Sequence, residues 1–144
     1  MELIEVLRVV ATVACGLVAG LLFVFSAGIM TALGRTPGGA EAMRAINAAV
    51  LNPAFLGVFT GSALVCAALV VAVVVAGGPA LLAAAGLVHL VGAFGVTVVR
   101  SVPMNDALAA GRLDWAAYRR RWTAWNHVRT AAAVVATAVL AAAG

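Results

Sequence analysis

Three long apolar runs most constrain what this chain can fold into. They cover residues 9–33, 54–76 and 80–99, and a fourth, less apolar run covers residues 122–143. A helix needs about 20 apolar residues to cross the hydrocarbon core of a bilayer, and the fourth run reaches that length only with its Trp-rich first turns. The sequence therefore predicts an all-α integral membrane protein, a four-helix bundle that forms one domain over residues 1–144.

The charge content excludes a soluble globular domain. Only 10% of the 144 residues are charged and 65% are hydrophobic, whereas a soluble domain carries about 25% charged residues. A chain this short cannot enclose so many apolar side chains, because small folds bury only about two-thirds of their surface. We therefore expect the lipid bilayer to solvate much of the chain.

The basic residues are all arginines and are unevenly distributed. Only Arg8 lies near the N-terminus, whereas the other eight lie in or beside the first and third connections: Arg35, Arg44, Arg100, Arg112, Arg119, Arg120, Arg121 and Arg129. Since cytoplasmic loops are rich in Lys and Arg, both connections are expected in the cytoplasm and both termini outside the plasma membrane. A nucleic-acid partner is not expected, because a DNA-binding module gathers its arginines on a solvated face.

The connections carry their own helix signals. Residues 43–50 have the i, i+3, i+4, i+7 spacing of an amphipathic helix, which we expect at the membrane interface. Asn52-Pro53 supplies an N-cap and a first-turn proline for the second span. Gly77-Gly78-Pro79 is so short that spans two and three should be antiparallel neighbours. Val102-Pro103 predicts a break after the third span, and Asp114 a helix start before an Arg- and Trp-rich segment.

Several polar residues are not explained by loop solvation and gather at the cytoplasmic ends of the predicted spans. They are Asn47, Asn52, Arg100, Asn105, Asn126, His127 and Arg129. A charge at membrane depth costs at least about 2.5 kcal/mol on insertion scales. Arg100 and Arg129 therefore either reach the lipid headgroups or serve a site.

The segment before and within the fourth span has an aromatic and polar stripe at helical spacing. It consists of Trp115, Tyr118, Trp122, Trp125, Asn126 and Arg129. This stripe is either an interfacial aromatic belt or the wall of a pocket for an aromatic substrate. His127 points about 100° away from Asn126 on a regular helix. If the stripe lines a cavity, His127 therefore cannot be the base in that cavity.

Histidine and cysteine give little indication of a metal site. His89 and His127 are the only residues for a bis-histidine haem, but their depths in the spans do not match. Cys15 and Cys66 lie in apolar runs, where a thiol usually serves as a small packing residue. With no C-x-x-C motif or Cys/His cluster in the sequence, we expect no metal ligands.

Five motifs occur in order along the chain. They are Phe25-Ser26 with Met30, residues 43–47 (Met-Arg-Ala-Ile-Asn), residues 52–55 (Asn-Pro-Ala-Phe), residues 102–105 (Val-Pro-Met-Asn) and residues 122–129 (Trp-Thr-Ala-Trp-Asn-His-Val-Arg). In these motifs the chain resembles the anthrone oxygenase-like family of small membrane proteins, most specifically in the last one. The resemblance implies an oxygenase that uses O₂ directly on an anthrone or another electron-rich phenolic substrate, with no cofactor.

The implied chemistry needs only a base and a stabilising pocket, because a deprotonated anthrone can itself pass an electron to O₂. We expect His127 to be the base and Arg100 or Arg129 to stabilise the oxyanion. The side chains expected to bind the small aromatic substrate are Asn47, Asn52, Asn105, Trp122, Trp125 and Asn126.

Two other interpretations stay open at this stage. The chain can be a small membrane binding or accessory protein that holds a quinone, haem or lipid without turnover, or a structural membrane component. In the structural case, alanine at Asn47 or Asn126 would change stability without abolishing any turnover. Homo-oligomerisation is also left open.

Overall fold

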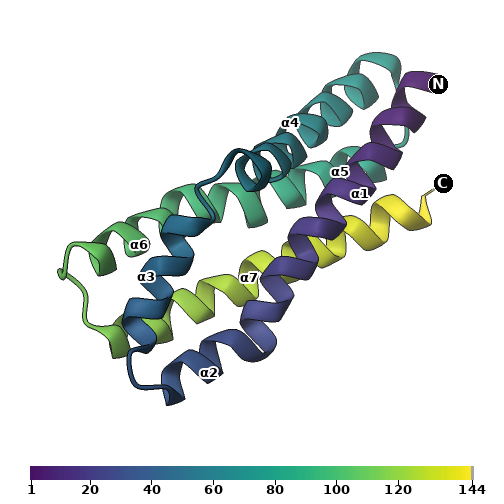
Figure 1. The fold of residues 1–144 in the computed structure, drawn as a ribbon. Helices are drawn as coiled ribbons and strands as arrows, with labels where there is room; N and C mark the ends of the chain where they lie inside the picture. The colour runs from purple at the N-terminus through teal and green to yellow at the C-terminus, as the bar shows by residue number, and fades with distance from the viewer. Residues whose placement is uncertain (144) are drawn as a thin grey trace.

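The computed structural model describes residues 1–143, which are helical apart from short connections and contain no strand (Figure 1). The first helical segment consists of α1 (Glu2–Val24), a π-helical turn (Phe25–Ile29) and α2 (Met30–Arg35). After it come α3 (Gly39–Ala49) and α4 (Pro53–Ala76). The next segment consists of α5 (Ala80–His89), two π-helical stretches (Leu90–Gly95 and Thr97–Ser101) and α6 (Val102–Ala109), and α7 (Trp115–Ala142) completes the fold.

Three helical segments are long and apolar enough to cross a membrane. They are Glu2–Arg35, Pro53–Ala76 and Ala80–Ala109. Large apolar side chains cover their outer surfaces, as at Leu64 and Val75, which are 67% and 81% exposed. Such a surface is stable in lipid and not in water, which supports the predicted integral membrane protein. α7 is not among the three, and its N-terminal half is rich in arginine.

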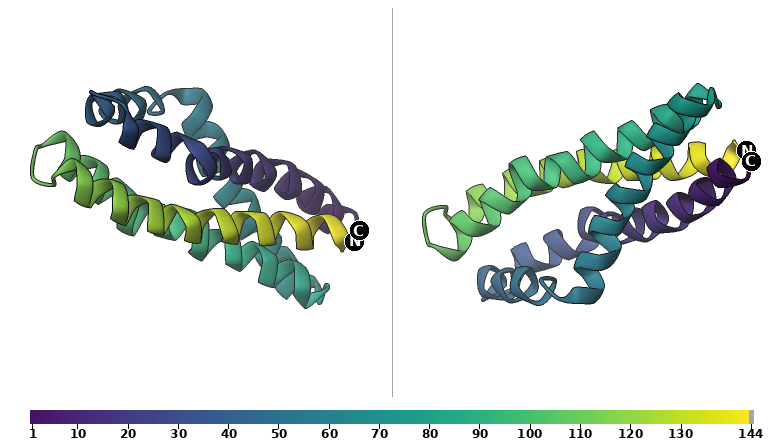
Figure 2. Two further views of the ribbon diagram at one scale, coloured as in Figure 1. Left: turned by 90° about the horizontal axis from the view of Figure 1, so that it is seen from below. Right: turned by 90° about the horizontal axis from the view of Figure 1, so that it is seen from above.

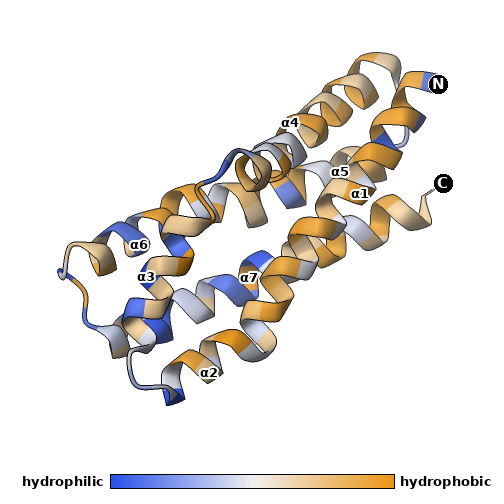
Figure 3. Ribbon diagram, viewed as in Figure 1, coloured by the Kyte–Doolittle hydropathy of each residue, from blue (hydrophilic) through white to orange (hydrophobic). Residues whose placement is uncertain are grey.

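The long helices pack side by side, and the chain ends lie together. α1 packs against α4 and α7, and α5 packs against the same two helices. The N-terminus, the C-terminus and the α4–α5 turn lie at one end, whereas the α2–α3 and α6–α7 connections lie at the other (Figures 1 and 2). The two Arg-rich connections therefore share one end of the molecule, where polar residues also gather (Figure 3).

Local signals in the sequence set several helix ends as predicted. The Asn52 side chain accepts a hydrogen bond from the backbone N–H of Phe55 at 2.9 Å, and Asp114 caps α7 in the same way. Gly77 ends α4 with a φ of +68°, a left-handed conformation that glycine adopts readily. The predicted amphipathic helix is α3, which buries Met43.

One predicted helix end is wrong. The third span was expected to end at Val99 and to break at Val102-Pro103, yet the helix continues to Ala109. Pro103 lies in the first turn of α6, directly after the π-helical stretch Thr97–Ser101. A first-turn proline is tolerated because its missing N–H is not needed there, and the wider π-helical turn before it changes the hydrogen-bond register.

Close backbone packing at Gly39 fixes the orientation of α3 relative to α2. A Cβ atom at this position would overlap the backbone carbonyl oxygen of Leu33 and lie 3.3 Å from the Trp115 ring. We expect Gly39→Ala to lower the free energy of unfolding in detergent by about 1–3 kcal/mol, measured by thermal melts followed by circular dichroism. Gly57→Ala on α4 is the matched control, because its Cβ would meet nothing within 4 Å. Equal melting temperatures for the two variants would contradict this close packing at Gly39.

Candidate functional site

A largely apolar cavity of about 520 Å³ lies among α1, α3, α4, α7 and the segment that ends in α6. Its apolar wall includes Leu22, Phe25, Met43, Phe55, Phe59 and Phe94, and its polar lining groups are Arg44, Asn47, Thr60, Thr97, Ser101, Asn105, Asp106, Trp122 and Arg129. Cavities of this size and composition are typical of small-molecule sites, in which a few polar groups set the orientation of the ligand.

Arg129 places a buried cation at this cavity. Its side chain is only 5% exposed. Nη1 donates a hydrogen bond to Oγ1 of Thr97 at 3.0 Å, and Nη2 donates to Oδ1 of Asn126 at 2.7 Å. Both acceptors are neutral, and Nε has no partner. The salt bridge found within residues 1–143 joins Arg8 to Glu5, so no carboxylate neutralises Arg129.

The Trp122 ring flanks this guanidinium. The Arg129 Cζ atom lies 5.0 Å from the ring centroid, a distance at which the cation is attracted to the π face. Trp122 also contacts the Phe25 ring, with a centroid distance of 5.6 Å. The cavity therefore presents a flat aromatic surface beside an unneutralised positive charge.

A second polar group centres on Asn105. The carbonyl Oδ1 of Asn105 accepts hydrogen bonds from the Tyr118 hydroxyl at 2.8 Å and from Nε1 of Trp122 at 3.1 Å. Asn47 donates to the Tyr118 hydroxyl at 3.3 Å. Burial raises the pKa of Tyr118 to about 12, so the phenol keeps its proton and remains a donor. The amide nitrogen of Asn105 takes part in none of these three bonds.

Asn126 positions Arg129 and does not line the cavity. The side chain is fully buried, and Nδ2 donates to the carbonyl oxygen of Leu22 at 2.9 Å and to Oγ of Ser26 at 2.7 Å. These two bonds tie α7 to the first helical segment. Because Oδ1 accepts from Arg129, the amide fixes the direction of the guanidinium.

His127 lies on another face of α7. It lines an open groove with Met30, Thr31, Arg35, Ala116, Arg119, Arg120, Thr123 and Ala124. Its Nδ1 lies 3.0 Å from Oγ of Ser26, and it does not line the cavity that Trp122 and Arg129 share. This is the separation that regular helical geometry predicts for adjacent residues, so the structure does not support His127 as a base in that cavity.

Three other predicted site residues also lie outside the cavity. The Arg100 guanidinium lies 4.8 Å from the Trp125 ring centroid, and neither side chain lines the cavity. Asn52 is exposed and serves as the N-cap of α4. Of the predicted residues, the structure brings Asn47, Asn105, Trp122 and Arg129 together at the cavity wall, with Asn126 directly behind Arg129.

Asp106 and Arg44 also line the cavity and were missed as site residues. Asp106 lies just after Val102-Pro103, where the helix was expected to break. Since the helix continues, Asp106 follows Asn105 on α6 and contributes a carboxylate to the wall. Arg44 donates from Nε to the carbonyl oxygen of Leu108 at 3.2 Å, which joins α3 to α6.

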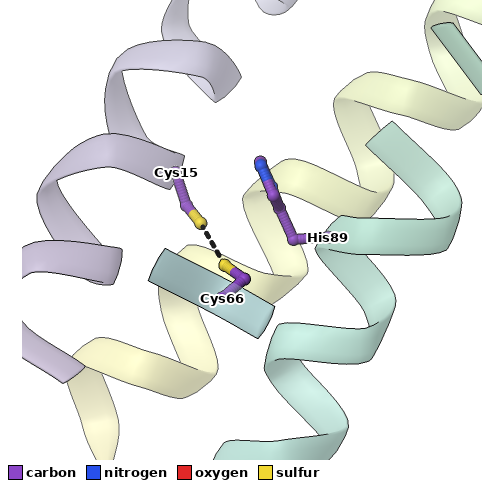
Figure 4. Close-up of side chains that lie close together, drawn as sticks. All are labelled: Cys15, Cys66 and His89. Atoms are coloured by element: carbon purple, nitrogen blue, oxygen red, sulfur yellow. Dashed lines mark hydrogen bonds between the residues drawn. The ribbon is translucent and has the colours of Figure 1, made fainter. Parts of the chain in front are cut away.

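The residues suited to a metal ion lie elsewhere. Cys15, Cys66 and His89 are all fully buried and come together in the helical core, away from the lining of the cavity (Figure 4). The sequence spacing gave no sign of this grouping, because the three residues come from three different helices. His89 contacts Ser62, whereas His127 contacts Ser26, so the two imidazoles do not form a shared haem site.

A comparison with known families gives one match. The sequence profile of a family described as anthrone oxygenase matches residues 53–139, which is more than half of the chain. The matched part runs from α4 into α7 and includes Asn105, Trp122 and Arg129. No significant match was found among curated proteins or among solved structures. Because this profile matches more than half of its residues, the chain belongs to the anthrone oxygenase family.

Proposed function

We propose that the protein is a membrane oxygenase that oxidises an anthrone-like or other electron-rich phenolic substrate with O₂ and without a cofactor. Arg129 carries this proposal, because it is a buried cation at the wall of an apolar cavity and has no carboxylate partner among residues 1–143. An unneutralised buried charge is unfavourable on its own. An aromatic anion in the cavity would neutralise it.

The lining suits an aromatic anion in shape as well as charge. The Trp122 ring and the Phe55, Phe59 and Phe94 side chains offer apolar contact surface for fused rings. Asn105 and Asn47 offer amide groups to substrate carbonyl and phenol oxygens. Arg129 would lie beside the oxygen on which the negative charge concentrates, where a fixed donor in a dry site has its largest effect.

The proposed reaction balances without a cofactor. A C–H bond of the substrate CH₂ group breaks, and the resulting enolate gives one electron to O₂. The substrate radical and superoxide combine through a new C–O bond, and the resulting peroxide anion takes up one proton. The remaining C–H bond and the O–O bond of this hydroperoxide then break with loss of water, which leaves a carbonyl. The CH₂ group thus becomes C=O, with one oxygen atom in the product and the other in water.

We assign the proton acceptor to Asp106 in place of His127. Asp106 is the acidic residue found in the cavity lining, and Arg129 on the same lining would lower the pKa of a bound carbon acid by favouring its anion. The Asp106 carboxylate is exposed, so a proton received there can pass directly to water.

We also propose that α7 is the fourth span, crossing at about residues 122–143, within a single membrane domain over residues 1–144. Its support is the packing of α7 against α1 and α5, two helices that are apolar enough to span. The shared end of the two Arg-rich connections favours the cytoplasm for that end and an outside location in the plasma membrane for both termini. The cavity would then open near the cytoplasmic surface, with α3 at the interface.

The direct test measures O₂ consumption and quinone formation when purified, detergent-solubilised protein is mixed with emodin anthrone. Acceleration over the spontaneous oxidation and over heat-denatured protein supports the oxygenase. Tight binding of anthrone or quinone by folded protein without acceleration would instead favour the small-molecule binding protein.

Two substitutions distinguish the cavity from the groove beside His127 as the site of the reaction. We expect His127→Ala to keep most of the acceleration, because His127 lies outside the cavity. Asp106→Asn should slow the reaction without abolishing it, since water at this exposed position can also accept the proton. Loss of activity in His127→Ala with retention in Asp106→Asn would move the site to the groove beside His127.

A further inference from the structure

We propose that Cys15, Cys66 and His89 form a binding site for a thiophilic divalent metal ion of the Zn²⁺ type. All three residues are fully buried. The two Sγ atoms lie 3.5 Å apart, and both sulfurs and a ring nitrogen of His89 lie within 4.8 Å of one another. This site goes beyond the oxygenase function and does not depend on it.

The ligands come from three helices that meet in the core. Cys15 is on α1, Cys66 is on α4 and His89 is the last residue of α5, and Figure 4 shows the side chains converging between these helices. Their apolar neighbours include Leu69, Ala85 and Leu140. A metal ion here would therefore join α1, α4 and α5 through direct bonds, in addition to the Ser62–His89 hydrogen bond and the contact between the two thiols.

The hydrogen bonds around His89 determine which ring nitrogen has a free lone pair. Oγ of Ser62 donates its one proton to the carbonyl oxygen of Phe59 at 2.7 Å. In the 2.9 Å contact between Ser62 and His89, Nε2 must therefore be the donor. The neutral imidazole then has its lone pair on Nδ1, and this buried atom has no hydrogen-bond partner.

This arrangement matches the usual support of a metal-bound histidine. A ligating imidazole nearly always donates its other N–H to a neighbouring acceptor, which fixes the tautomer and the ring orientation. Ser62 has that role here. A buried acceptor without a partner is unfavourable in an apolar core, and a metal ion bound to Nδ1 would remove this penalty.

Charge and spacing both favour a divalent ion. Two thiolates and a 2+ ion sum to zero, whereas a monovalent ion would leave a net negative charge among apolar side chains. Two sulfurs that each lie 2.3 Å from a tetrahedral ion are about 3.8 Å apart, close to the 3.5 Å between these two. Binding would displace two thiol protons, and three protein ligands would leave a fourth position for a small ligand such as water.

The test uses the full chain, purified in detergent without chelators from cells grown with added Zn²⁺. Elemental analysis by mass spectrometry should find about one Zn²⁺ per chain, falling by at least about tenfold in a Cys15→Ala/Cys66→Ala variant. His127→Ala is the matched control and should keep its metal, because it removes the other histidine, which lies beside Ser26.

Cobalt supplies a readout that a purely structural role would not give. Co²⁺ added to metal-free protein should produce thiolate-to-cobalt charge-transfer absorption that is absent from the double cysteine variant. Ser62→Ala should weaken Co²⁺ binding by about 10–100-fold, because Nε2 loses its acceptor while both sulfurs remain. This variant keeps every ligand, so its result does not depend on the double variant folding.

Three results would each overturn the proposal. The first is wild-type protein that contains two free thiols and no metal after growth in Zn²⁺. The second is a disulfide between Cys15 and Cys66, detected by mass spectrometry after alkylation without reductant. The third is equal metal content in wild-type protein and in the double cysteine variant, which would show adventitious binding elsewhere.

Discussion

Replacing Arg129 with glutamine is expected to slow anthrone oxidation by about 10²–10³-fold. Removal of one donor aimed at a developing oxyanion typically has an effect of this size, and Arg129 is the buried cation that lines the cavity. Glutamine keeps hydrogen-bonding capacity but has no charge. The rate is measured as O₂ uptake with emodin anthrone, on protein whose folding is checked by circular dichroism and size-exclusion chromatography.

Two further arginine variants complete this measurement. Arg112→Gln is the matched control, because Arg112 is exposed on the connection between α6 and α7 and does not line the cavity. It should retain the wild-type rate. Arg129→Lys should recover part of the lost rate, since it restores the charge but not the planar fork that contacts Thr97 and Asn126. Folded Arg129→Gln with the wild-type rate would contradict an anion site at Arg129.

Replacing Asn126 with alanine is expected to affect stability and turnover together. The variant loses hydrogen bonds to Leu22, Ser26 and Arg129. Two of these bonds join α7 to the first helical segment, and inter-helix hydrogen bonds in membranes average about 0.6 kcal/mol each, so the free energy of unfolding should fall by about 1 kcal/mol. The oxidation rate should also fall, because the Arg129 guanidinium loses the acceptor that fixes its direction.

The paired measurement distinguishes a functional from a structural role. Thr137→Ala is the control on the same helix, because its hydroxyl bonds only the carbonyl oxygen of Ala133 in α7. Both the melting temperature and the oxidation rate are measured for each variant. A less stable Asn126→Ala protein with undiminished turnover would show that the buried amide supports the fold alone, and it would remove Asn126 as a positioning residue.

Features that depend on neighbouring residues were predictable from the sequence. The Asn52 and Asp114 caps and the turn at Gly77 follow from short-range hydrogen bonding and backbone sterics. Three of the predicted spans correspond to helical segments with the required length and hydropathy. Helical periodicity also predicted that His127 and Arg129 point to different surroundings, as their separate cavities show.

Contacts between residues on different helices could not be predicted from the sequence. Periodicity states which residues share a face of one helix, but it does not state which faces of two helices meet. The sequence therefore could not predict that Asn105 accepts hydrogen bonds from Trp122 and Tyr118. Nor could it predict that Arg100 and Trp125 contact each other outside the cavity. The path of the helix through Pro103 depended on a π-helical register that no single residue type predicts.

The sequence by itself determined that this is a helical membrane protein of the anthrone oxygenase family, because apolar length and ordered motifs are local properties of the chain. Only the tertiary structure decided which polar groups meet. It left Arg129 buried with no carboxylate partner in the described part of the chain. It also brought Cys15, Cys66 and His89 within 4.8 Å of one another from three helices. Both outcomes depend on how helices far apart in sequence pack, and that packing is a property of all their contacting faces together.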